Sequence, residues 1–231
     1  MKASIKKGMW FYLFLILPVA LYAQKDVTQF LGIPVDGSKS EMIEKLKDKG
    51  YTISPYKKDG LVGEFNGTDV QIYIATNNNK VRRIAVMDAN PMSESNIKIR
   101  FNNLLHQFRN NTRYLPTPDS TIVKYTIPQD EDISFQLLVN KKSYQATFFQ
   151  QTAVYDSLTL KINTLKKKQT SNDGYTDQLT KLLYTNQLNQ INELYNCFNK
   201  KVWVSIYKLI GGYGIAIYYD NVYNESNGEG L

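Results

Sequence analysis

Apolar and polar residues alternate along residues 70–87 in a pattern that predicts a β-hairpin. The alternate positions on both sides of a short polar turn hold Val70, Ile72, Ile74, Ile84 and Val86. A period of two is typical of antiparallel strands. The turn falls on three asparagines, residues 77–79, and asparagine tolerates positive φ. We therefore expect two paired strands joined at these asparagines.

A helical period predicts three amphipathic helices, at residues 39–49, 94–110 and 176–199. Ser38 and Glu41 form a capping box before the first helix, and Gly50 ends it. A weaker helix is indicated by Leu158, Ile162 and Leu165. The remaining apolar runs predict strands at residues 51–56, 61–65, 122–127, 133–139, 144–149, 202–209 and 215–219.

These elements repeat one order three times: a helix followed by antiparallel strands. This order predicts an α+β fold, an antiparallel sheet with helices on one face built from repeated helix-then-strands units. The units divide the chain as residues 24–150 for the first two, 151–175 for a variable, partly mobile insert, 176–220 for the third helix and closing hairpin, and 221–231 for a polar tail.

The first 23 residues predict a secretory signal peptide. Three lysines are followed by an apolar run and then by small residues, so we expect cleavage between Ala23 and Gln24. A membrane anchor is the alternative, but the run is shorter than the ~20 apolar residues of a spanning helix. We expect an exported protein, periplasmic or secreted, that does not span the membrane after cleavage.

Charge argues against nucleic acid as a partner. Removal of residues 1–23 takes away three lysines and no acid, so 25 basic and 21 acidic residues remain and the formal charge falls from +7 to +4. The basic residues are scattered, except for the lysines at 166–168, and do not form a stripe interleaved with stacking aromatics.

The sequence predicts no catalytic, cofactor-binding or metal site. His106 and Cys197 are the only residues of their kinds, which leaves too few ligands for zinc and too few groups for Ser-His or Cys-His catalysis. The acids at residues 130–132 lack the alternating ligands and glycine of a calcium loop. The glycines at 211–214 are interpreted as a hairpin turn.

Aromatic residues give the best candidate for a binding surface. Trp203, Tyr207 and Tyr218 are predicted to lie on the sheet face turned away from the helices, where they could receive a sugar, a peptide or a protein. The alternative is that these rings only pair across strands.

Four short segments stand out along the chain: FLGIP at residues 30–34, the capped helix at 38–50, GEFNG at 63–67 and YYDN at 218–221. Together they resemble uncharacterised secreted proteins of Bacteroidota. The order of helix and strands is also similar to that of the outer-membrane assembly lipoprotein BamE and of the secreted β-lactamase inhibitor protein. The first family implies no activity and no functional residues, and the chain has no lipid-accepting cysteine at the cleavage point.

Together these features predict an exported, non-enzymatic binding or interaction protein of the periplasm or cell envelope. A carboxylate-based hydrolase of envelope or dietary polymers, or a structural envelope component, are the alternatives.

Overall fold

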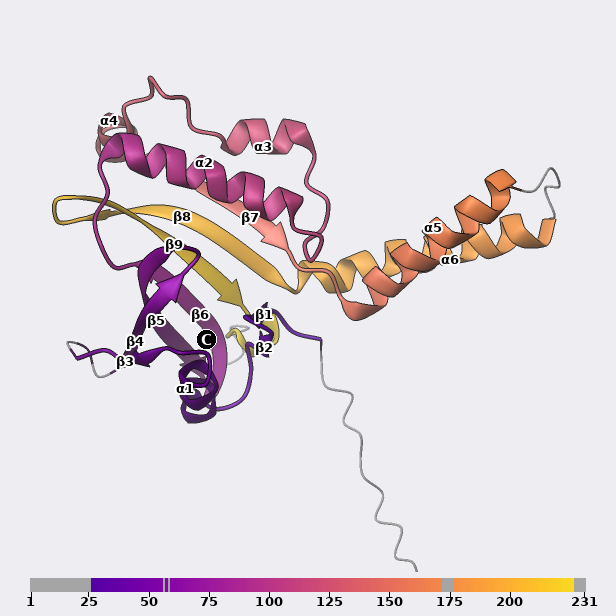
Figure 1. Ribbon diagram of the computed structural model, residues 1–231, viewed down its shortest axis with the longest axis horizontal. Helices are drawn as coiled ribbons and strands as arrows, with labels where there is room; N and C mark the ends of the chain where they lie inside the picture. Colours follow the sequence, from indigo (N-terminus) through magenta and orange to yellow (C-terminus); the bar gives the residue numbers. More distant parts are fainter. Residues whose placement is uncertain (1–25, 56, 58, 172–176, 227–231) are drawn as a thin grey trace, which may run out of the picture.

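The computed structural model describes residues 26–226, except residues 56, 58 and 172–176. Its centre is a seven-stranded antiparallel sheet in the order β3-β4-β5-β6-β9-β8-β7 (Figure 1). Six α-helices accompany this sheet and a separate two-stranded ribbon, so the predicted α+β class is confirmed.

The first half of the chain supplies one edge of the sheet and a helix that packs on it. Its elements are β1 (Gln29–Phe30), β2 (Ile33–Pro34), α1 (Lys39–Lys47), β3 (Thr52–Ile53), β4 (Gly60–Phe65), β5 (Thr68–Asn77) and β6 (Lys80–Asp88).

The second half supplies the other edge and the remaining helices. Its elements are α2 (Glu94–Asn110), α3 (Asp119–Tyr125), α4 (Ile133–Leu138), β7 (Gln145–Phe149), α5 (Ala153–Ser171), α6 (Asp177–Phe198), β8 (Lys201–Leu209), β9 (Gly212–Asp220) and the short 3-10 helix η1 (Val222–Asn224). Strand β9 pairs with β6, which joins the two halves into one sheet.

The predicted hairpin is present as β5 and β6, with a tighter turn than expected. Asn78 and Asn79 have φ values of 46° and 61°, the left-handed conformation that a two-residue hairpin turn requires. Asn77 is not part of the turn, because it pairs with Lys80 as the last residue of β5.

Local capping fixes where the first two long helices begin. The hydroxyl of Ser38 accepts from the N–H of Glu41, and the Glu41 carboxylate accepts from the Ser38 N–H in return. Ser93 caps α2 in the same way by accepting from the N–H of Asn96. The predicted bounds of α2, residues 94–110, agree with the structure.

Two predicted strands are helices instead. Residues 122–127 lie mostly in α3 and residues 133–139 mostly in α4, so the middle pass contributes only β7 to the sheet. The side chain of Asp132 accepts from the N–H of Phe135, and this cap starts a helix over a segment whose apolar residues alternate. The alternating apolar residues of this segment do not all face the core, because Ile133 is buried whereas Phe135 is exposed.

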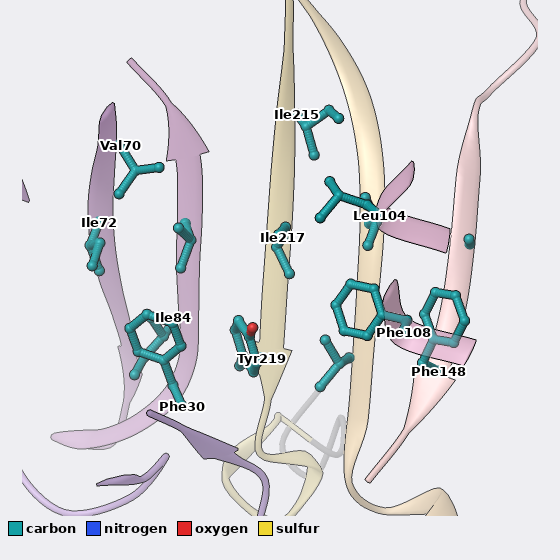
Figure 2. Close-up of a cluster of buried hydrophobic side chains, with 14 of the residues drawn as sticks. Phe30, Val70, Ile72, Ile84, Leu104, Phe108, Phe148, Ile215, Ile217 and Tyr219 are labelled. Atoms are coloured by element: carbon teal, nitrogen blue, oxygen red, sulfur yellow. The ribbon is translucent and has the colours of Figure 1, made fainter. Parts of the chain in front are cut away.

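Helices α1 and α2 cover the same face of the sheet and close one hydrophobic core. The buried face carries Ile72, Ile84 and Ile217 on successive strands, with Phe108 of α2 stacked on Phe148 of β7 at 4.6 Å (Figure 2). Helices on one face are thus confirmed for α1 and α2, whereas the third predicted helix, at residues 176–199, is α6, which projects from the sheet instead (Figure 1). In the described chain the opposite face has no helix over the central strands.

An ion pair ties α2 to the sheet inside this core. Arg100 donates to both carboxylate oxygens of Asp88, at 2.7 and 3.1 Å, and the backbone N–H of Ile215 donates to the same carboxylate at 2.9 Å. Asp88 lies where β6 and β9 separate, so its carboxylate occupies the gap in the ladder.

Helices α5 and α6 form an antiparallel arm that projects from the sheet (Figure 1). The weak helix expected near residue 162 is thus the 19-residue α5. The partly mobile insert expected at residues 151–175 is therefore mostly helix α5, and its last residues, 172–175, lie outside the described residues.

The predicted polar tail is ordered where it leaves the sheet. Asn221 is buried and donates to the carbonyl of Val35 at 2.7 Å, and Asn224 donates to the carbonyl of Val81 at 2.8 Å. The two side-chain amides therefore connect the residues after β9 to the first half of the chain. The later part of the tail, residues 227–231, lies outside the described residues.

Candidate functional site

The sheet face turned away from α1 and α2 forms the candidate site, and we call it the open face. Strand alternation places every second residue there, and the register puts Arg83, Tyr218, Trp203 and Thr147 near one another across four strands. Its further members are Tyr73, Ala85, Met87, Phe149, Ser205, Tyr207, Ala216 and Asp220.

Trp203 and Tyr218 are directly opposite on β8 and β9, and their rings stack. The ring centroids are 3.9 Å apart and the planes differ by 19°. Both side chains are partly exposed, so the stack presents ring surface to solvent. The predicted cross-strand pairing and the predicted position on the open face therefore occur together.

A buried carboxylate holds this stack in place. Asp220 accepts from the indole Nε1 of Trp203 at 2.8 Å and from Nε and Nη2 of Arg83 at 2.5 and 2.9 Å. The Asp220 side chain is only 2% exposed, so its charge is satisfied by these donors rather than by water.

Arg83 adds a cation beside both rings. Its guanidinium carbon is 5.4 Å from the Trp203 ring and 5.2 Å from the Tyr218 ring. The hydrogen bond to Asp220 raises the pKa of Arg83 above its already high ordinary value, so this group keeps its charge. The Nζ of Lys201 lies 5.7 Å from the centroid of the same ring.

Tyr207 crosses the sheet without joining the stack. A side chain at Gly214 would begin 2.8 Å from the Tyr207 ring, because the ring lies over this glycine. The hydroxyl then donates to the carbonyl of Asp88 on β6 at 2.8 Å. Burial raises the pKa of Tyr207, so the phenol stays protonated and keeps this bond.

The three predicted aromatics thus share one face, but only Trp203 and Tyr218 touch as a pair. Sequence reasoning missed Arg83 and Asp220 as members of the site. The alternation in β6 already assigns Arg83 to the face opposite Ile84, and this signal could have found it. Its pairing with Asp220 joins residues 137 positions apart, which no local pattern shows.

Apart from the open face, a hollow that we call the crevice opens between α2 and the N-terminal ribbon. It has a volume of about 630 Å³ and is lined by Tyr51, Phe65, Phe108, Tyr114 and Tyr219 among others. Its hydroxyls already have protein partners: Tyr51 donates to the Glu64 carbonyl at 3.1 Å, and Tyr114 and Tyr219 bond to each other. Its tyrosine hydroxyls are therefore engaged within the protein, while Lys49, Glu64 and Gln107 also line the hollow.

The other sequence candidates lie apart from the open face and from the crevice. His106 is exposed on α2, and Cys197 is buried between α5 and α6, where burial raises its pKa. Asp132 caps α4, while Glu131 is held by Lys142 and Tyr144. Within residues 26–226, leaving out the undescribed positions, no three His, Cys, Asp or Glu side chains are grouped to hold a metal ion.

No helix in the described part of the chain is both long enough and apolar enough to cross a membrane. Comparison of the chain with protein-family models, with curated proteins and with solved structures finds no match. The resemblance to secreted Bacteroidota proteins stays a prediction, and function has to be argued from the geometry of the chain itself.

Proposed function

We propose that this chain is an exported, non-enzymatic binding protein of the periplasm or cell envelope, and that the open face receives its ligand. The observation that carries the proposal is the partly exposed Trp203 and Tyr218 stack, held by Asp220 and flanked by the cation of Arg83. Rigid rings provide contact area with little loss of side-chain entropy on binding.

The construction of the face favours a polypeptide partner with aromatic or acidic side chains. The sheet holds the rings on paired strands and the ion pair fixes their orientation, so the surface is prepared before binding. Flat rings bordered by Arg83 and Lys201 match a partner that stacks on them and carries negative charge at its edge.

Export rests on the leader of residues 1–23, with cleavage proposed between Ala23 and Gln24. Fractionation of cells that produce the full chain, with N-terminal sequencing of the product, tests this step. A product that keeps residue 1 and stays in the cytoplasm would remove the export part of the proposal.

The binding step is tested by a pull-down from envelope extract with the mature protein, followed by titration of the captured partner. Thr147 pairs with Trp203 on the open face, so Thr147→Glu should block the face and repel the negative edge of the partner, and it should weaken binding at least about tenfold. Val123→Glu is the matched control, because Val123 is 71% exposed on α3, away from the open face.

Equal binding by the Thr147→Glu and Val123→Glu proteins would reject the open face as the site. An empty pull-down, together with no thermal shift across panels of peptides and glycans, would reject the binding function. Circular dichroism and unfolding midpoints of both variants show that any loss reflects the surface and not the fold.

A further inference from the structure

Helix α6 carries two stripes of side chains. One stripe packs against α5, whereas the other is largely exposed apart from the contact of Phe198 with Phe149. The inner stripe faces α5 and recurs at heptad spacing: Leu183, Asn186, Gln190, Glu193 and Cys197. Gln190 donates to the hydroxyl of Thr159 at 2.6 Å and Glu193 accepts from Thr152 at 2.7 Å, so this stripe forms the seam of the arm.

The second stripe, here called the outer stripe, lies on the side of α6 turned from α5. Its members and their exposed fractions are Tyr184 (66%), Leu188 (46%), Ile191 (59%), Tyr195 (71%) and Phe198 (44%). They follow one another at steps of four and three residues, which keeps them in one row about 21 Å long.

This spacing selects a helix as the occupant. Apolar residues that recur at steps of four and three insert between those of a facing helix, whereas the outer positions of a solvent-exposed helical hairpin are normally polar. A row of five large exposed side chains exceeds the scattered apolar residues that soluble surfaces tolerate.

The flanks and the area favour a second copy of the same helix. The positions on either side of the outer stripe are uncharged: Gln178, Thr180, Thr185, Gln187, Asn192 and Leu194. Lys181, one step before Tyr184, is the nearest charge on this side of the helix, so the five members of the outer stripe can meet those of a second copy without like-charge repulsion. The exposed parts of the five side chains amount to roughly 500 Å² in each copy, so a pair reaches the ~1,000 Å² that a specific interface needs.

The base of the arm favours an antiparallel pair. Phe198 already packs on Phe149 of β7, with ring centroids 5.1 Å apart, so the outer stripe ends against the sheet. A parallel pair would bring both sheets to the same end, whereas an antiparallel pair separates them. In that register Ile191 lies opposite Leu188 of the second copy, and Tyr195 lies opposite Tyr184 of the second copy.

We propose that two copies of this protein associate through the outer stripe of α6, as an antiparallel four-helix bundle made by their two arms. The contact uses the arm and not Trp203 or Tyr218, so it is independent of ligand binding at the open face.

Sedimentation and light scattering of the exported, purified protein test the association. The unaltered protein should be a dimer at micromolar concentration, and Ile191→Lys should weaken the dimer by roughly tenfold or more, because it buries an unpaired charge. Leu160→Lys is the matched control: Leu160 is 63% exposed on α5, outside the outer stripe, and its variant should remain a dimer.

A mixing experiment tests the register. Leu188→Glu and Ile191→Lys each weaken the homodimer, but in the antiparallel pair a mixture places the new Glu opposite the new Lys and restores dimers. Parallel packing gives no such restoration, so its absence would overturn the antiparallel arrangement. A protein that stays monomeric, whether free or bound to lipid vesicles, or a dimer that Ile191→Lys leaves unchanged, would overturn the proposal as a whole.

Discussion

The indole N–H of Trp203 donates to the carboxylate of Asp220, which lies on the neighbouring strand and is almost wholly buried. The same carboxylate accepts two bonds from Arg83 on β6, so one side chain links three successive strands of the open face. The aromatic surface therefore depends on a charge beneath it, and stability and binding should change together when that charge is removed.

Asp220→Asn should lower the free energy of unfolding by about 2 to 4 kcal/mol, because it leaves Arg83 without its anion inside a partly buried site. Urea denaturation at neutral pH measures the loss. Asp59→Asn is the control, since Asp59 is 83% exposed in its pair with Lys39 and should change stability by no more than about 0.5 kcal/mol. Equal losses in the two variants would show that the buried network adds no more to the free energy of unfolding than an exposed ion pair does.

Gly212→Ala should be strongly destabilising although the residue begins a surface hairpin strand. A Cβ there would lie 2.4 Å from the carbonyl oxygen of Met92, whose backbone is bound to Tyr213 on both sides and cannot retreat. We expect a loss of about 2 kcal/mol or more, measured by denaturant unfolding.

Gly60→Ala is the matched control for this substitution. Gly60 also lies in a strand, but its nearest neighbour would be the Tyr73 ring at 3.5 Å, an ordinary contact. Its loss should stay below about 1 kcal/mol. A Gly212→Ala protein as stable as the Gly60→Ala protein would contradict the close approach of Met92.

The elements that the sequence predicts well are those whose signals are local. The stripe of α2 and the capping box at Ser38 and Glu41 lie within a few residues of one another, and both helices begin where expected. The segments at residues 122–127 and 133–139 are short, and alternation over six or seven residues cannot distinguish a strand from a helix that packs on only one residue, such as Ile133.

The open face shows the same limit at the level of the site. Alternation in β8 places Trp203 and Tyr207 on one face, since their neighbours Val204 and Ile206 must be buried. The support of that face comes from the pairing of β6 with β9, which joins Arg83 to Asp220 through long-range register. Such register is decided by packing of the whole sheet, so it has no signature in either strand alone.

Arg100→Met should separate α2 from the sheet at one end. It leaves the buried carboxylate of Asp88 with the Ile215 N–H and without its cation, and we expect a loss of about 3 kcal/mol in the free energy of unfolding. Hydrogen exchange should show faster exchange in the first turns of α2. The double variant with Asp88→Asn should recover part of the loss, whereas strictly additive losses would mean that the two side chains do not interact.

Alkaline pH should destabilise the protein through its buried phenols. Burial raises the pKa of Tyr219 well above its ordinary value of 10.0, and burial also raises those of Tyr51, Tyr114, Tyr144, Tyr155 and Tyr207. The unfolded chain releases these protons near pH 10 while the folded chain retains them. This stabilisation is complete below that pH and is lost as pH rises, by up to about 1.4 kcal/mol per pH unit for each phenol.

Tyr219→Phe should make this loss less steep. The variant removes one phenol that ionises only on unfolding, so the slope of unfolding free energy against pH between 10 and 11 should decrease by about one proton equivalent. Its stability at pH 7 should fall by about 1 kcal/mol, because the bond to Tyr114 is lost. Identical slopes for the variant and the unaltered protein would show that Tyr219 ionises as easily in the folded chain as in the unfolded one.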